Sequence, residues 1–166
     1  MGDIGAPKAE AARDAVLRTN PDIVVAAQSQ RLTPVNAAAL IDKASIVIDA
    51  ADNFPVTYML SDLCLAVSKP LISASVLGLS GYVGAYCGGA PSYRAVFPDV
   101  PDVAGSCASS GVLGSAVAVL GGLQAHLALH LLLDRMISPM IRRPARAAAA
   151  RCIGWERPLP SNFISR

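Results

Sequence analysis

Residues 45–55 have the sequence SIVIDAADNFP, which joins a short apolar run to two carboxylates, an amide and a proline. An apolar run rich in β-branched residues is typical of a strand that is buried on both faces of a parallel sheet. Because proline is favoured in the first turn of a helix, Pro55 indicates that a helix follows directly. The stretch therefore predicts a strand that leads into a helix, as in a doubly wound α/β fold.

The segments on both sides of this stretch continue the alternation of helices and strands. Proline, asparagine and glycine separate the segments, and alanine-rich stretches favour helix. We expect helices over residues 7–19, 33–42, 55–68 and 111–133. We expect strands over residues 23–27, 45–49, 71–75 and 81–86, and a loop over residues 87–110. This order predicts βαβ units, and so an α/β domain with a mostly parallel sheet and flanking helices.

The charge and cysteine content exclude several classes of protein. The net charge of +2 provides no strong field, so we expect no nucleic-acid partner. The four cysteines include no CxxC pair, and the first residues lack a secretory signal, so we expect a cytoplasmic protein. Residues 145–151 are rich in alanine and arginine. We therefore expect one domain over residues 1–137 and an Ala/Arg/Pro-rich tail over residues 138–166.

The apolar run of residues 111–133 contains no formally charged side chain and is long enough to span a bilayer. Gln124, His126 and His130 interrupt its second half, and no aromatic belt flanks it. We therefore expect a buried helix and no membrane contact, with a membrane anchor as the alternative. His126 and His130 have a spacing that can bind a metal on one helix face, but without a third ligand we expect surface or interface histidines.

Polar side chains gather at the carboxyl end of the strand predicted over residues 45–49. Asp49, Asp52 and Asn53 lie there, just before a helix begins. Ligands of an open parallel sheet bind outside the carboxyl ends of its strands, and carboxylates can hold Mg²⁺ beside nucleotide phosphates. The alternative is structural: an aspartate that caps the helix and an asparagine in a turn.

A series of short motifs resembles the ThiF/MoeB/HesA family of sulfur-carrier-protein adenylyltransferases, and is closest to the ThiF branch. The resemblance covers about residues 2–134. The motifs are, in chain order, DIGAPKAE at 3–10, NPD at 20–22, DAADNFP at 49–55, KPLISAS at 69–75, FPD at 97–99, Cys107, GVLG at 111–114 and LQA at 123–125. Each motif is weak alone, but their order and spacing together are specific.

The resemblance implies an ATP- and Mg²⁺-dependent enzyme that adenylylates the C-terminal Gly-Gly carboxylate of a ubiquitin-like sulfur carrier protein. Sulfur transfer of the thiamin or the molybdopterin type would follow. By the same resemblance, Lys8 contacts the ATP phosphates, Asp52 coordinates Mg²⁺ with Asn53 beside it, and Cys107 forms a thioester or an acyl disulfide. A lysine is a compact cation suited to phosphate, which agrees with the first of these roles. Family members are commonly homodimers.

The sequence also departs from the family pattern. The glycine-rich GxGGxG turn and its βα unit should precede residue 1, so we expect an incomplete Rossmann-like ThiF fold that lacks its first βα unit and is N-terminally truncated. Thr57 stands where the family usually has arginine. Ser92 and Ala95 replace two cysteines that bind zinc in many members, so zinc is not expected. The alternative function is a non-catalytic carrier-binding or dimerisation module that has lost ATP chemistry.

Overall fold

The computed structural model describes residues 5–99, 111–137 and 151–153 of the chain. The chain divides into two compact units, Met1–Thr33 and Pro34–Arg166. The domain boundary expected after residue 137 stays a prediction, because most of the residues beyond it lie outside the described part.

The described residues of the first unit contain one helix, α1 (Lys8–Thr19). The Pro7 carbonyl accepts the first backbone hydrogen bonds of α1, and the helix ends at Asn20, as its sequence predicts. The strand predicted over residues 23–27 is wrong: these residues form neither helix nor strand, and Val24 is 99% exposed. The physical reason is that a strand needs a paired neighbour, and the described residues of this unit contain no other strand.

The second unit contains a sheet of four strands: β1 (Val47–Asp49), β2 (Pro70–Leu77), β3 (Ser80–Cys87) and β4 (Arg151–Ile153). The strands lie in the order β1-β2-β3-β4. Strand β2 is parallel to β1 but antiparallel to β3, which is in turn antiparallel to β4. The α/β class is confirmed, whereas the described sheet is mixed rather than mostly parallel. The reason is the short turn at Gly78 and Leu79, since so short a connection joins only antiparallel strands.

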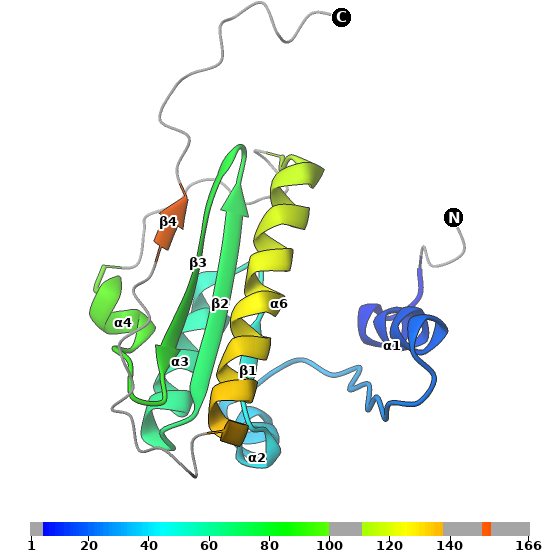
Figure 1. Ribbon diagram of the computed structural model, residues 1–166, viewed down its shortest axis with the longest axis horizontal. Coiled ribbons are helices and arrows are strands. Elements are labelled where there is room, and N and C mark those ends of the chain that lie inside the picture. Colours follow the sequence, from blue (N-terminus) through cyan, green and yellow to red (C-terminus); the bar gives the residue numbers. More distant parts are fainter. Residues whose placement is uncertain (1–4, 100–110, 138–150, 154–166) are drawn as a thin grey trace, which may run out of the picture. The chain divides into compact units, whose positions relative to one another are not determined.

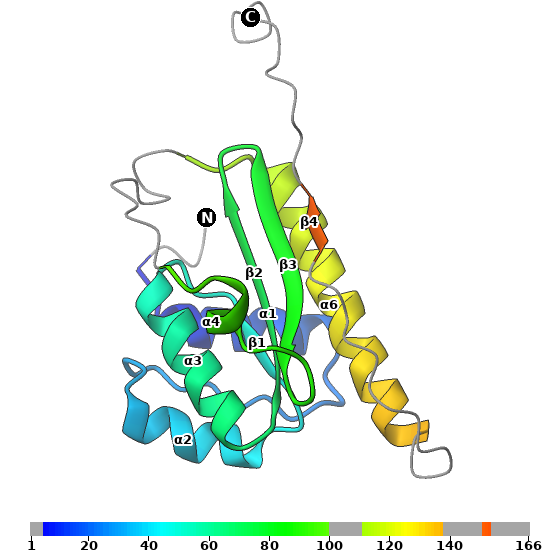
Figure 2. The ribbon, with the colours of Figure 1, turned by 90° about the vertical axis from the view of Figure 1, so that its left-hand side faces the viewer.

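Helices cover both faces of this sheet. Figures 1 and 2 show α3 (Phe54–Ala66) on one face and α6 (Gly114–Ile137) on the other, while α2 (Pro34–Lys43) packs against α3. A fourth, short helix, α4 (Tyr93–Val96), also packs on α3. The predicted helix over residues 55–68 is confirmed, with its start one residue earlier and its end two residues earlier than predicted.

Helix α6 is buried along one face only. Leu120, Gln124 and Ala128 recur every fourth residue and lie against the sheet. At Gly81 of β3 a Cβ atom would collide with the Leu120 side chain, so this glycine lets the helix approach closely. Residues Gly114–Leu133 are long and apolar enough to cross a membrane, and only 17% of their apolar window is buried. The expectation of a buried helix is therefore wrong for most of α6 and holds only for the face that packs on the sheet.

The core lies on both faces of the sheet, between the sheet and α6 on one face and between the sheet and α3 on the other. Ile72, Ala85 and Ala128 form one buried cluster between the sheet and α6. Strand β4 lies within the segment expected as a tail, so residues 151–153 of that segment pair with β3. The α3 side of the sheet and the carboxyl end of β1 together frame the candidate site.

Candidate functional site

The first feature of the site is the turn that follows β1. Asp49 ends the strand and is 2% exposed. One oxygen of its carboxylate accepts the Ala51 N–H at 2.9 Å, and the other accepts the Ser73 hydroxyl at 2.9 Å. Ser73 is the register partner of Asp49 on the parallel strand β2 and is fully buried. The local turn thus supplies a partner to one oxygen of this buried side chain, and the neighbouring strand supplies a partner to the other, as burial of a polar group requires.

A glutamine from α6 holds the same turn from the other side. The Gln124 side-chain amide donates to the Asp49 carbonyl at 2.6 Å and to the Ile72 carbonyl at 3.1 Å. Gln124 is 8% exposed, in a helix that is otherwise apolar on its buried face. One amide group therefore joins backbone oxygens of two neighbouring parallel strands.

Asp52 and Asn53 follow on the exposed side of the turn. The Asn53 side-chain oxygen accepts the Val56 N–H at 3.1 Å and caps α3. Its amide nitrogen donates to the Asp52 carboxylate at 3.2 Å. Both residues are exposed, unlike Asp49. The turn thus presents one accessible carboxylate at the N-terminus of a helix, where the helix dipole favours anions.

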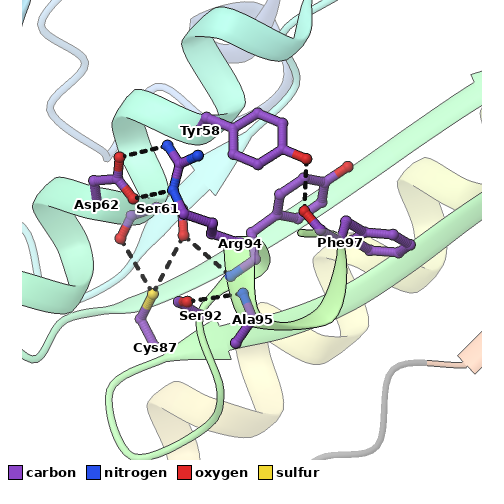
Figure 3. Close-up of polar contacts among 9 residues, drawn as sticks. Tyr58, Ser61, Asp62, Cys87, Ser92, Arg94, Ala95 and Phe97 are labelled. Carbon is purple, nitrogen blue, oxygen red and sulfur yellow. Dashed lines mark hydrogen bonds and ion pairs between the residues drawn. The ribbon is translucent and has the colours of Figure 1, made fainter. Parts of the chain in front are cut away.

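The second feature is the attachment of α4 to α3, drawn in Figure 3. The Tyr93 N–H donates to the Ser61 hydroxyl at 3.0 Å, and the Tyr58 hydroxyl donates to the Phe97 carbonyl at 2.7 Å. The Arg94 guanidinium contacts both oxygens of Asp62, at 3.2 and 2.8 Å, and lies 4.7 Å from the centre of the Tyr58 ring. Residues 92–97 are therefore anchored to α3 by side chains.

The sequence matches the ThiF family over residues 1–158. This chain belongs to the ThiF family.

Two relatives are similar in sequence to this chain over about three quarters or more of its length. The adenylyltransferase and sulfurtransferase MOCS3-1 of Zea mays is 43% identical over 74% of this chain and 27% of the relative. The SAMP-activating enzyme E1 of Haloferax volcanii is 36% identical over 80% of this chain and 50% of the relative. This ThiF-family chain thus spans between about a quarter and half of the length of these relatives.

A crystal structure of E. coli MccB with MccA-N7isoASN has a TM-score of 0.48 with this chain. The sequence identity is 18%, over 87% of this chain and 36% of that chain.

The structure places the predicted ThiF-family residues in different parts of the chain. Asp52 and Asn53 lie together at the start of α3, with the hydrogen bonds given above. Lys8 is the exposed first residue of α1 and belongs to the unit Met1–Thr33. Cys107 lies outside the described residues, so its role stays a prediction.

The sequence analysis places Ser73 in the motif at 69–75 and Gln124 in the apolar run of residues 111–133, but predicts no role for either in the site. Each is a polar residue in a mostly apolar element, which is the available signal for a buried hydrogen-bonding role. The parallel register that sets Ser73 opposite Asp49 was needed to connect them.

Ser92 and Ala95 stand at the positions where the family resemblance places two zinc-binding cysteines. The Ser92 hydroxyl accepts the Ala95 N–H at 3.1 Å and caps α4, and Ala95 offers no ligand atom. In the described part of the chain, no three or more His, Cys, Asp or Glu side chains form a group that could hold a metal ion. The residues at this segment therefore do not fit a cysteine-type zinc site.

Two thiols and two phenols of the described residues have raised pKa values because of burial. Cys64 is fully buried, as its position on an apolar helix face predicts, and burial raises the pKa of its thiol to about 12. Burial also raises the pKa of Cys87, of Tyr82 and of Tyr93. Because the thiolate is the nucleophilic form, Cys64 and Cys87 are poor nucleophiles at neutral pH. His126 and His130 are exposed on α6, in agreement with the expected surface position.

Proposed function

We propose that this chain carries part of the ATP site of an adenylyltransferase that activates a ubiquitin-like sulfur carrier protein. The observation that carries this proposal is the exposed Asp52 carboxylate, presented at the N-terminus of α3 by a turn that is hydrogen-bonded on both sides. Family membership and the printed names of the relatives support it. Carriers of both the thiamin and the molybdopterin type fit the proposal.

In the proposed reaction, an oxygen of the carrier's C-terminal Gly-Gly carboxylate attacks the α-phosphorus of ATP, and pyrophosphate leaves. The product is an acyl-adenylate, and the protein contributes mainly by positioning and by stabilising charge. Lys8 would contact the phosphates, and Asp52 would hold Mg²⁺ with Asn53 beside it. A magnesium ion prefers oxygen ligands and is usually held by one or two carboxylates plus phosphates, which fits an accessible aspartate. When bound, Mg²⁺ neutralises phosphate charge.

We assign the following step to Cys107. Its thiolate would attack the carbonyl carbon of the acyl-adenylate, AMP would leave, and the carrier would remain as a thioester. The buried, protonated thiols of Cys64 and Cys87 are unsuited to this step.

Pyrophosphate exchange tests the proposal, with the 166-residue chain, ATP, Mg²⁺ and a carrier that ends in Gly-Gly. We expect Asp52→Asn to lower exchange by about 100-fold or more, because it removes a charge that acts directly on the metal. Asp42→Asn is the matched control, since Asp42 is an exposed carboxylate on α2, and exchange should be unchanged. Absence of exchange together with absence of an ATP-dependent thermal shift would contradict catalysis by this chain.

A non-catalytic carrier-binding or dimerisation module is the second candidate. Thr57, at the position where arginine is usual, is buried at 4% exposure and presents no cation. Carrier binding that does not require ATP and is unaffected by Asp52→Ala would favour this module. Strict dependence of carrier binding on ATP would exclude it.

We also propose a cytoplasmic homodimer that does not enter membranes. The apolar residues on the outward side of α6, including Val119 and Leu129 at 58% and 60% exposure, support burial against a second protein. Light scattering should give twice the chain mass for the detergent-free soluble protein. Recovery of the protein only in detergent would instead support a membrane anchor.

A further inference from the structure

Two carboxylates that lie three residues apart in the β1 turn have opposite environments. Asp49 is 2% exposed and both of its oxygens accept hydrogen bonds from this chain. Asp52 is exposed and accepts from the Asn53 side chain. The same side-chain type is therefore used in two ways within one turn.

The partners of Asp49 are all neutral. They are the Ala51 amide and the Ser73 hydroxyl, while Gln124 contacts the Asp49 backbone carbonyl. The two ion pairs found among the described residues, Arg13–Asp14 and Arg94–Asp62, do not involve Asp49. Losing a partner of a buried carboxylate is costly, so each of these bonds constrains the geometry of the turn.

The bond from Asp49 to the Ala51 N–H fixes the path of the backbone that leads to Asp52. The Asn53 cap fixes the same backbone from its other end, through the Val56 N–H. The exposed carboxylate of Asp52 thus projects from a segment whose backbone is held at Ala51 on one side and at Val56 on the other.

We propose that Asp49 is a positioning residue that, with Ser73 and Gln124, holds the Asp52 carboxylate in place to bind Mg²⁺ beside ATP. The proposal rests on the proposed function. Asp49 itself is 2% exposed, so it presents no accessible oxygen to a metal or a nucleotide. Its hydrogen bonds, and not its charge, are what the site requires.

Asp49→Asn separates hydrogen bonding from charge. The asparagine oxygen can accept the Ala51 N–H, and its amide can donate to the Ser73 hydroxyl, which also accepts hydrogen bonds. We expect the Mg²⁺ concentration for half-maximal ATP binding, measured by calorimetry, to stay within about threefold of the wild type in this variant. Asp49→Ala should raise that concentration about tenfold or more, as is typical when a residue supporting a metal ligand is lost.

Asp52→Asn is the control for a residue that acts by charge, and it should weaken Mg²⁺-dependent binding strongly. A loss in Asp49→Asn as large as in Asp52→Asn would overturn the proposal, because charge at position 49 would then be required. Unchanged binding in a folded Asp49→Ala variant would also overturn it.

Amide hydrogen exchange at Ala51 provides a readout that does not depend on ATP. Exchange should accelerate at least about tenfold in Asp49→Ala and remain near the wild-type rate in Asp49→Asn. Should the wild type bind no Mg²⁺–ATP, the proposed function fails, yet this exchange rate still decides whether Asp49 holds the turn.

Ser73→Ala keeps the test decisive if Asp49→Ala does not fold. It removes one donor and leaves the Ala51 bond, so we expect a smaller, several-fold rise in the Mg²⁺ requirement. A Ser73→Ala variant that matches the wild type in both the Mg²⁺ requirement and Ala51 exchange would contradict the proposal.

Discussion

The carboxyl end of β1 and the contact between α3 and α4 are both built from segments far apart in the chain and both contain hydrogen bonds, but only the second adds aromatic packing. At β1, the side chains of Asp49 and Gln124 make directional hydrogen bonds to backbone atoms. At α3–α4, the Tyr93 ring lies 5.2 Å from the rings of Tyr58 and Tyr86 and 4.8 Å from Phe97. Aromatic packing contributes stability through buried area, whereas hydrogen bonds contribute position. Damage at α3–α4 should therefore lower stability, and damage at β1 should alter the site first.

The largest expected effect is at the centre of the aromatic contact. Tyr93→Ala removes a ring that is 2% exposed and leaves a cavity, so the free energy of unfolding should fall by about 3–5 kcal/mol. Urea denaturation measures this fall. Tyr93→Phe is the matched control: it keeps the ring and loses only the hydroxyl contact to Tyr82 at 2.8 Å, and should cost about 1 kcal/mol. Equal losses in both variants would show that packing is not the main force here.

A smaller effect is expected at the polar end. Gln124→Met keeps the length of the side chain but leaves the Asp49 and Ile72 carbonyls without their amide donor, so about 1–3 kcal/mol should be lost. His126→Met is the control on the same helix, and an exposed substitution should change stability by less than about 0.5 kcal/mol. The Ala51 amide should exchange faster in Gln124→Met than in the wild type, and at the wild-type rate in His126→Met. If the Ala51 amide exchanged in Gln124→Met at the wild-type rate, α6 would not be needed to hold the turn after β1.

The pH dependence of the free energy of unfolding should report on the thiols and phenols whose pKa values are raised by burial. The folded-state pKa of Cys64 is about 12 and those of Cys87, Tyr82 and Tyr93 are also raised, so the folded protein retains protons that the unfolded chain releases. The free energy of unfolding should therefore fall as pH rises above about 9, by up to about 1.4 kcal/mol per pH unit for each such group. Denaturation between pH 8 and 11 measures the slope, and Cys64→Ala should reduce it. A slope in Cys64→Ala equal to that of the wild type would show that the Cys64 thiol does not contribute to the pH dependence of stability.

The smallest effect is expected at the rim of the aromatic contact. The Arg94–Asp62 ion pair is half exposed, and exposed pairs are screened by salt. Arg94→Ala should lower the melting temperature slightly at low salt and by less at high salt. Arg94→Lys keeps the charge and should retain part of the effect. A loss that is independent of salt would assign the role of Arg94 to its contact with the Tyr58 ring.

The local structure of the chain was largely predictable, because proline and asparagine mark its helix ends directly. The start of α1 after Pro7 and of α3 beside Pro55 followed from backbone geometry alone. Pairing was less predictable: the apolar run at residues 23–27 has strand-forming residues but no paired neighbour in the described part of its unit. Pairing depends on distant segments, which local patterns do not encode.

The candidate site was predictable only in its exposed half. The motif at residues 49–55 identified Asp52 and Asn53, and the cap that Asn53 provides is a local property. The different burial of Asp49 depends on Ser73 and Gln124, which lie 24 and 75 residues away in the chain. The pattern of one segment does not distinguish two aspartates whose environments are set by other segments.

The hydrogen bond from Gln124 to Asp49 has a consequence for the order of folding. It closes a loop of 75 residues, so it forms only after α6 has docked, and contacts of such separation form slowly. During synthesis, β1 and α3 leave the ribosome well before α6 does. We therefore expect a nascent chain to form its hairpin and α3 before the turn after β1 acquires its last hydrogen bond.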